Sequence, residues 1–381
     1  MRIVYMLTSL GVGGAERQAL AIAERMAGRG HAVAMVTLRP RLEDEWPTSL
    51  PVTRLNLRKN PASFLAAAFR ARWFLREFCP DIVHSHSFHA NILARLLKLV
   101  VPASAIVSTI HNVHEGGYLR TLAYRLTDPL CRQTTAVSQA VADRFIATRA
   151  VPTAKCLVLR NAIDTAEWIP NPGRRTQARS ALAANADFVW LTAGRLVPSK
   201  DYPNLLCAFA TLRRNRSDAR LWIAGQGTAA QVSALSALAA DLGLGSSVQW
   251  LGLRRDLAAL LDAADAFVLA SAWEGMPLAL AEAMAMEKPV VATDAGGVRE
   301  LMGGRGTLVP PKSSAALADG MLALMQRCTE SRLSEARAAR RHVQLNFSIE
   351  ARFNDWEALY RRLLNPAAEP RAESLQRSRA D

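Results

Sequence analysis

The 381-residue sequence is poor in cysteine, in aromatic residues and in long apolar runs. Its cysteines are scattered, with no Cys-x-x-Cys pair, at positions 79, 131, 156, 207 and 328. This pattern argues against a disulfide framework and a zinc–thiolate site, and it is typical of a reducing compartment. No uninterrupted apolar run approaches the roughly 18–20 residues that a membrane-spanning helix needs. The apolar start MRIVYMLTSL is short and leads into GVGGAER rather than a cleavage site, so we expect a soluble cytoplasmic protein without a secretory signal.

The chain is basic, with 47 Lys and Arg against 33 Asp and Glu, a net charge of +14. Most of the excess lies in residues 1–165, which hold 21 basic against 11 acidic residues, whereas residues 166–381 hold 26 against 22. Such a charge favours anionic partners: nucleic acid, phosphorylated ligands or an anionic membrane surface. The basic residues form no long cluster with interleaved aromatics, so we do not expect a nucleic-acid partner.

Short apolar or β-branched runs alternate with longer stretches of helical periodicity, and this rhythm occurs twice. The first set predicts strands at 2–7, 31–38, 81–86, 105–111, 134–138 and 155–161, with helices at 16–29, 62–78, 89–99 and 118–132. The second set predicts strands at 188–194, 219–225, 247–252, 266–271 and 289–294, with helices at 203–214, 228–242, 256–263 and 277–286. A last helix is expected at 349–364. This order predicts an α/β protein of two Rossmann-like, doubly wound domains that face a cleft.

The stretch IPNPGRR at 169–175 separates the two sets. We therefore predict an N-terminal domain over residues 1–167 and a C-terminal domain over 168–346. Residues 347–365 are expected to pack back on the first domain, and residues 366–381 to form a disordered tail.

Two glutamates lie in the stretch SAWEGMPLALAEAM at 271–284. Glu274 falls in the turn between a predicted strand and a helix whose first turn contains Pro277, a favoured position for proline. Glu282 lies more than one turn into that helix. Free N–H groups at a helix start bind phosphate, and a carboxylate on either side can accept hydrogen bonds from sugar hydroxyls. The pair suits a nucleotide-sugar; the alternative is a glutamate that favours the helix dipole and a second, exposed one.

Other strand ends carry groups that suit the same ligand. Arg195 and Lys200 follow the strand at 188–194 and can neutralise a diphosphate, or they are simply solvated. Gly225 and Gly252 end two further strands and can approach a base through the backbone, or they only form turns. His111, at the end of the strand at 105–111, either contacts a substrate or caps a turn.

Gly11-Val12-Gly13-Gly14-Ala15-Glu16 follows the first strand and opens a helix. It is similar to the dinucleotide fingerprint Gly-x-Gly-x-x-Gly, but Glu16 replaces the third glycine, which disfavours an NAD-dependent oxidoreductase. The backbone there can still cradle a phosphate. His84 and His86 share one face of a strand and lie near His89, but no carboxylate or cysteine completes a familiar ligand set, so no metal site is expected.

Together these elements resemble the retaining glycosyltransferases of family four, which have the GT-B fold. The resemblance covers residues 1 to about 360 and rests on GVGGAER, DIVHSH, STIHN, LRNAID, GRLVPSK, IAGQG and EGMPLALAEAMAMEKPVVATDAGGVREL. Its most specific part is the Glu-x7-Glu element. LRNAID departs from the family's usual Asn-Gly-Ile-Asp at Ala162, which puts the local turn in doubt.

The resemblance implies a role for each site residue. Glu274 contacts the donor sugar, Glu282 holds the ribose, and Arg195 and Lys200 bind the diphosphate. His111 lies near the donor sugar and the acceptor hydroxyl. Glu274, His111, Arg195 and Lys200 are the expected catalytic residues. Further donor contacts are expected from Gly13, Gly14, Gly225, Gly252, Gly275, Met276, Pro277 and Leu278. The family typically needs no metal, in agreement with the missing Asp-x-Asp motif, so no cofactor is expected.

The partners expected are a nucleotide-sugar, UDP- or GDP-linked, and a saccharide or lipid-linked saccharide acceptor bound by the N-terminal domain. The pathway implied is bacterial surface polysaccharide synthesis, of exopolysaccharide or lipopolysaccharide. The helix over Phe64–Phe78 mixes arginines with aromatics and either contacts an anionic membrane face or packs ordinarily on the sheet. The alternatives are a nucleotide-sugar epimerase of the same build and, among non-enzymes, a basic nucleic-acid-binding protein.

Overall fold

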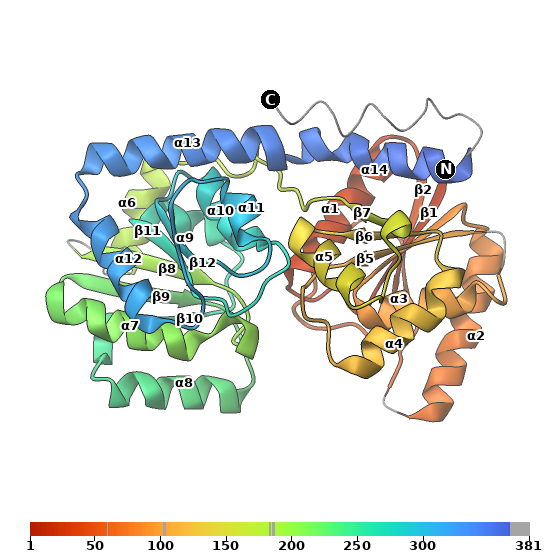
Figure 1. Cartoon of the computed structure of the whole chain (residues 1–381), viewed down its shortest axis with the longest axis horizontal. Helices are drawn as coiled ribbons and strands as arrows, with labels where there is room; N and C mark the ends of the chain where they lie inside the picture. Colours follow the sequence, from red (N-terminus) through yellow and green to blue (C-terminus); the bar gives the residue numbers. More distant parts are fainter. Residues whose placement is uncertain (59, 102–103, 183, 185–186, 366–381) are drawn as a thin grey trace.

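Two parallel sheets organise the molecule, one in each half (Figure 1). The structure, a computed structural model, describes residues 1–58, 60–101, 104–182, 184 and 187–365. The first sheet has the order β3-β2-β1-β4-β5-β6-β7, with β1 Arg2–Leu7, β2 Ala32–Thr37, β3 Val52–Arg54, β4 Ile82–His86, β5 Ala105–Ile110, β6 Gln133–Ala136 and β7 Cys156–Val158. The second has the order β10-β9-β8-β11-β12-β13, with β8 Phe188–Ala193, β9 Ala219–Ala224, β10 Val248–Gly252, β11 Ala266–Leu269, β12 Val290–Thr293 and β13 Thr307–Val309. The predicted fold class, two Rossmann-like α/β domains facing a cleft, is confirmed.

Helices connect the strands and cover the sheets (Figure 1). In the first half they are α1 Gly14–Gly28, α2 Pro61–Phe78, α3 Phe88–Leu97, α4 Tyr118–Thr127 and α5 Gln139–Ala147. In the second half they are α6 Pro172–Ala181, α7 Tyr202–Asn215, α8 Ala229–Asp241, α9 Leu257–Ala263, α10 Leu278–Ala285, α11 Val298–Met302, α12 Ser314–Gln326 and α13 Thr329–Phe347, and α14 Ile349–Leu364 follows. In each sheet the β-α-β order brings the carboxyl ends of all strands to one edge, where ligands bind in open α/β sheets.

Several predicted boundaries differ from the structure. The helix expected at 118–132 ends at Thr127, and a 3-10 turn over Asp128–Leu130 that contains Pro129 follows it. Helix α6, which was not predicted, begins within the stretch 169–175: the Asn171 side chain accepts a hydrogen bond from the Arg174 backbone N–H, and a proline occupies the first helical position. Both are ordinary helix-start signals. The elements β3, α5, α11, β13, α12 and α13 were not predicted.

The chain passes between the two halves twice, and the two passages touch. Ile163 lies in the first passage and Ser348, between α13 and α14, in the second; they form an isolated parallel bridge. The Ile163 N–H donates to the Phe347 carbonyl at 2.9 Å, and the Ile349 N–H donates to the Ile163 carbonyl at 2.8 Å. These bonds satisfy backbone groups at both passages.

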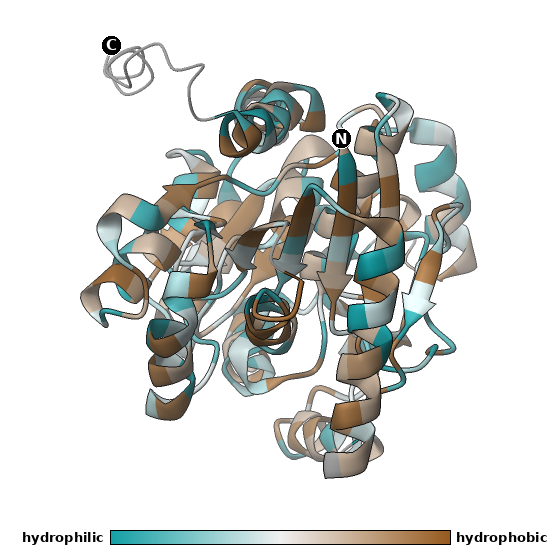
Figure 2. Cartoon of the chain, turned by 90° about the vertical axis from the view of Figure 1, so that its right-hand side faces the viewer, coloured by the Kyte–Doolittle hydropathy of each residue, from teal (hydrophilic) through white to brown (hydrophobic). Residues whose placement is uncertain are grey.

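The last described helix, α14, lies against the first half while α13 runs along the second (Figure 1). Its residues Phe353, Trp356 and Tyr360 are buried in one core cluster with Ile3 and Tyr5 of β1. The strands of this half are largely apolar, as their brown colour shows in Figure 2. The tail predicted over residues 366–381 falls outside the described residues.

Candidate active site

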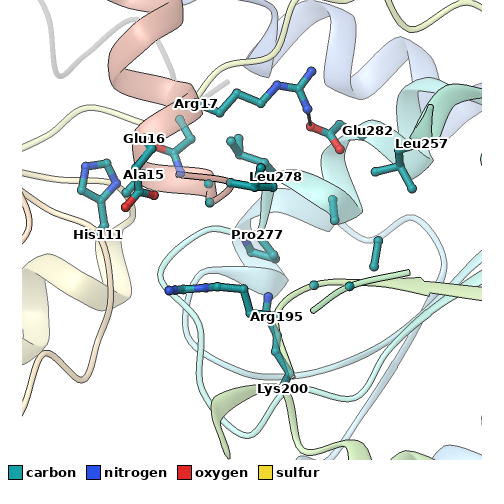
Figure 3. Close-up of a pocket in the computed structure, with 18 of the residues that line it drawn as sticks. Ala15, Glu16, Arg17, His111, Arg195, Lys200, Leu257, Pro277, Leu278 and Glu282 are labelled. Atoms are coloured by element: carbon teal, nitrogen blue, oxygen red, sulfur yellow. Dashed lines mark hydrogen bonds and ion pairs between the residues drawn. The ribbon is translucent and has the colours of Figure 1, made fainter. Parts of the chain in front are cut away.

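A cavity of about 700 Å³ lies between the halves, at the loops that follow the strands of both sheets. That size lies within the range of small-ligand sites. The predicted site residues that line it are Gly13, Gly14, His111, Arg195, Lys200, Gly225, Glu274, Met276, Pro277, Leu278 and Glu282. In Figure 3, His111 lies on the side of α1, whereas Arg195 and Lys200 lie below Pro277.

Gly252 and Gly275 do not line the cavity but support its wall. Gly252 has a φ of +65°, in the left-handed region that favours glycine, and its carbonyl accepts the Gly225 N–H at 2.8 Å. A Cβ on Gly275 would lie 1.9 Å from the His111 carbonyl oxygen. Glycine at 275 therefore lets the two halves approach closely. The sequence had predicted only a donor contact at this position.

Glu274 is held rigidly at the base of the cavity. The residue is 7% exposed, and its Oε1 accepts hydrogen bonds from Lys200 Nζ and from Ser271 Oγ, both at 2.6 Å. A buried carboxylate is stable only when it is paired and hydrogen-bonded, and both conditions are met here. Among the described residues Oε2 has no partner, so it can accept from a ligand hydroxyl.

Glu282 is buried at the other end of the cavity, and its partner comes from the opposite half. Arg17 of α1 reaches across to it, with 2.5 Å between Nη1 and Oε1 (Figure 3). The guanidinium carbon lies 5.0 Å from the ring centre of Trp168 and 5.5 Å from that of Trp46. Burial raises the pKa of Glu282, and the charge of Arg17 opposes that rise.

The start of α1 has a glutamate as well as backbone N–H groups. Gly13 is the N-cap, and Glu16 occupies the third helical position, where an acidic side chain can fold back over the helix start. A Cβ on Gly13 would lie 2.3 Å from Glu16 Oε2, so this carboxylate covers the glycine. Burial raises the pKa of Glu16, while its own backbone N–H and the charge of Arg195 lower it. The expected phosphate cradle therefore includes an acidic group that faces Arg195.

His111 forms the wall contributed by the first half. Its Nε2 lies 2.9 Å from His86 Nδ1, and its backbone N–H donates to Glu115 Oε1 at 3.3 Å. Burial lowers the pKa of His111 to about 3, so the ring is neutral at physiological pH. Burial also raises the pKa of Glu115 to about 7, although Tyr124 donates a hydrogen bond to its Oε2 at 2.6 Å.

Several cavity residues were missed in the sequence. Arg17 directly follows the GGAE segment, and its position alone gave no hint of a partner 265 residues away. Asn161 lies in the LRNAID segment, and its Nδ2 donates to the Met276 carbonyl at 3.1 Å, which ties the two halves. Trp46 and Trp168 stand outside any helix or strand, where no periodicity marks them.

The histidines weighed as metal ligands have other partners. His84 Nδ1 lies 2.6 Å from Tyr360 Oη, and His84 Nε2 lies 2.6 Å from Thr109 Oγ1. Within the described ranges, no three His, Cys, Asp or Glu side chains are grouped so that they could hold a metal ion. In the same part of the chain, no helix combines the length and apolar character needed to cross a membrane.

The fold and the cavity define a glycosyltransferase of the GT-B class, and comparison with known families gives the same result. The family model described as Glycosyltransferase Family 4 matches residues 12–167, and the model described as Glycosyl transferases group 1 matches residues 187–327. Together the two models span most of the chain. The protein belongs to the glycosyltransferases of family four.

The curated relatives include enzymes named for different transfers and one glycosyltransferase that is uncharacterized. The chain is 26% identical to a glycogen synthase of Mycobacterium tuberculosis, over 91% of this chain and 89% of that protein. It is 28% identical to an Escherichia coli UDP-Gal:alpha-D-GlcNAc-diphosphoundecaprenol alpha-1,3-galactosyltransferase, over 57% of this chain and 58% of that one. An uncharacterized glycosyltransferase of Methanocaldococcus jannaschii, MJ1059, is 26% identical, and the match spans 64% of this chain and 63% of that protein.

Solved structures have the same fold over nearly the whole chain. Anabaena HepE in complex with UDP and glucose superposes with a TM-score of 0.82 at 22% identity, covering 94% of this chain and 98% of that one. Sucrose-phosphate synthase from Thermosynechococcus elongatus superposes with a TM-score of 0.83 at 18% identity, covering 96% and 100%. At such identities the likeness supports the fold alone.

Proposed function

We propose that the protein transfers a hexose from a UDP- or GDP-linked donor to a saccharide acceptor, with retention of configuration and without a metal ion. The observation that carries this proposal is the pair between Lys200 and the buried Glu274 at 2.6 Å, facing a cavity whose opposite wall holds His111. A cation and a carboxylate side by side suit a ligand that carries phosphate next to sugar hydroxyls. Glu282, at the far end of the cavity, is the proposed ribose contact.

The proposed chemistry follows from where charge develops. As the bond between the anomeric carbon and the phosphate oxygen breaks, negative charge grows on the nucleoside diphosphate. Arg195 and Lys200 stabilise that charge, a preorganised electrostatic effect that is usually large. The acceptor hydroxyl attacks from the side on which the leaving group departs, and a departing phosphate oxygen takes its proton. Glu274 acts through Oε2, which accepts a hydrogen bond from a hydroxyl of the donor sugar while Lys200 and Ser271 hold its Oε1.

We further propose a lipid-diphosphate-linked saccharide as the acceptor, at the cytoplasmic face of the membrane, in surface polysaccharide synthesis. One relative is named for a diphosphoundecaprenol-linked acceptor, and another, from Rhizobium meliloti, for lipopolysaccharide core biosynthesis. The excess positive charge of residues 1–165 suits such an anionic acceptor.

The surface of α2 supports contact with the membrane. Leu65, Phe69 and Trp73 recur every four residues and are between 60% and 69% exposed, so they form one apolar stripe on the helix. Arg76, one turn beyond Trp73, is exposed as well. Exposed apolar side chains beside arginines are typical of helices that lie in an anionic membrane interface.

The donor assignment is tested by titrating the purified protein with UDP, GDP, ADP and NAD without metal, beside the Glu282→Ala variant. Micromolar binding of UDP or GDP that weakens in the variant supports the site. Binding of NAD alone, or of no nucleotide, refutes it. In a turnover assay with the donor so identified, Glu274→Ala and Lys200→Ala should each abolish transfer while the protein stays folded; near-normal turnover in both would contradict the assignment.

The membrane contact is tested with vesicles that contain an anionic phospholipid. The double variant Phe69→Ser/Trp73→Ser should bind them much more weakly than the parent protein. Leu345→Ser is the matched control, because Leu345 is 73% exposed but lies on α13 in the other half. Equal losses in the two variants, or no binding by the parent at any salt concentration, would remove the membrane contact.

A further inference from the structure

Three histidines lie in a row behind the wall of the cavity. His84 and His86 are on the same face of β4, and their ring centres are 4.1 Å apart. His86 is 1% exposed, and its Nδ1 lies 2.9 Å from Nε2 of His111, which lines the cavity. His84 packs against α14, and His111 faces the cavity. His86 does neither, and the proposed reaction gives it no role.

The other nitrogen of His86, Nε2, is buried. It makes no hydrogen bond with any residue that the structure describes. Burial keeps both rings neutral, because it lowers the pKa of His86 well below its usual value and that of His111 to about 3. Each imidazole ring therefore carries one N–H. A single N–H then lies between His86 Nδ1 and His111 Nε2.

Two proton arrangements satisfy the short contact. In the first, His86 Nδ1–H donates to His111 Nε2, and the unpartnered His86 Nε2 is a bare lone pair. In the second, His111 Nε2–H donates to His86 Nδ1, which leaves an N–H on His86 Nε2 buried without an acceptor. In native proteins, buried N–H groups without an acceptor are rarer than buried acceptors with an unused lone pair. The unpartnered nitrogen thus favours the first arrangement.

The first arrangement determines what His111 offers to a ligand. With Nε2 accepting from His86, the proton of His111 is on Nδ1, which has no hydrogen-bond partner among the described residues. We propose that His86 is a positioning residue that holds His111 as the Nδ1–H tautomer, so that His111 donates a hydrogen bond to a substrate oxygen and does not act as a base. This deepens the proposed function, on which it rests, because a substrate oxygen lone pair is then the group that His111 recognises.

The position of His86 is itself fixed from behind. His84 is bonded at both ring nitrogens, to Tyr360 of α14 and to Thr109 of β5, and it packs against the His86 ring. The Trp356 ring centre lies 5.0 Å from that of His84. A chain of contacts therefore connects α14 with the wall of the cavity.

The matched variants His86→Leu and His86→Asn test the proposal, because leucine and asparagine are similar in size and only asparagine can donate to His111 Nε2. We expect His86→Leu to lower kcat at least thirtyfold with the nucleotide Kd unchanged. The kcat of His86→Asn should be at least tenfold higher than that of His86→Leu. A merely structural role predicts equal losses in the two variants, tracking their stability. Equal losses, or kcat of His86→Leu within twofold of the parent, overturn the proposal.

The tautomer is measured separately, by 15N NMR of ring-labelled histidine, with His111 assigned through the His111→Gln variant. A protonated Nδ1 and an unprotonated Nε2 on His111 support the proposal. A protonated Nε2 overturns it. Since this readout needs no turnover, failure of the proposed transfer reaction and failure of the tautomer assignment are told apart.

Discussion

Arg17 on α1 and Glu282 on α10 form an ion pair across the two halves of the molecule, with 2.5 Å between Nη1 and Oε1. The glutamate side chain is 4% exposed, whereas the arginine side chain is 29% exposed. Removing one partner of such a pair leaves the buried charge uncompensated, which costs much more than losing an exposed pair. The pair therefore contributes to the closed arrangement of the halves.

Replacing Arg17 by leucine should lower the free energy of unfolding by about 1–3 kcal/mol, because the Glu282 carboxylate stays buried without its partner. Urea denaturation measures the change. The control is Arg299→Leu, which breaks an exposed pair with Asp294 and should change the free energy of unfolding far less than Arg17→Leu does. Equal effects of the two variants would show that the pair between the halves contributes no more to the free energy of unfolding than an exposed pair.

Ser271→Ala should lower kcat about tenfold without changing the nucleotide Kd. Ser271 donates to Glu274 Oε1 at 2.6 Å, and a hydrogen bond to a charged group contributes about 1.5–3 kcal/mol. Its loss frees Glu274 to move while Lys200 still neutralises it. Steady-state kinetics with a nucleotide titration measure both quantities. Ser247→Ala, a buried serine that bonds to the Leu244 carbonyl far from the cavity, is the control and should keep kcat.

Gly275→Ala should lower the free energy of unfolding by about 1–3 kcal/mol, the usual cost of overpacking. Its Cβ would lie 1.9 Å from the His111 carbonyl oxygen, a backbone atom of the opposite half that cannot move aside alone. Gly28→Ala is the matched control, because a Cβ there meets nothing within 4 Å and alanine favours the helix. A parallel decrease in both variants, measured by urea denaturation, would contradict the steric explanation.

Stability should fall as the pH drops below about 6.5. Burial lowers the pKa of His84, His86 and His111 beneath that value, so the unfolded chain binds protons that the folded chain does not, and acid favours unfolding. Glu16, Glu115 and Glu282 act in the opposite direction. Burial raises their pKa values, that of Glu115 from 4.5 to about 7, so each of them stabilises the folded protein more as the pH falls.

The His86→Asn variant isolates one of these terms. Thermal unfolding from pH 7.5 to 4.5 should show a shallower loss of stability in the variant than in the parent protein, since one protonation site is gone. Identical pH profiles would mean that His86 does not titrate differently in the folded and unfolded chains.

Local patterns predicted the sheets well because their strands are buried on both faces and appear as continuous apolar runs. The strand at 2–7 is an example, since five of its six residues are buried. Helix α13 shows where this signal ends. It buries only Ala336, Ala339, Val343 and Phe347 over 19 residues, so its apolar periodicity is too weak to predict a helix.

The cavity was predicted where its residues follow strand ends, because parallel strands bring those ends to one edge. Lys200 and Glu274 both lie there as expected, but the hydrogen bond between them was not predicted. Arg17 and His86 were not recognised as site residues, since their partners lie on other elements and only the packing of the halves brings them together. A single sequence carries no local sign of such pairs.

The double passage between the halves has a mechanical consequence. Two connections that touch act as one common pivot, because neither can move without the other. The bonds that join Ile163 to Phe347 and Ile349 bind the two passages into one such pivot. Any change in the angle between the halves has to bend the chain at this place, and α14, which packs on the first half, then shifts relative to the end of α13.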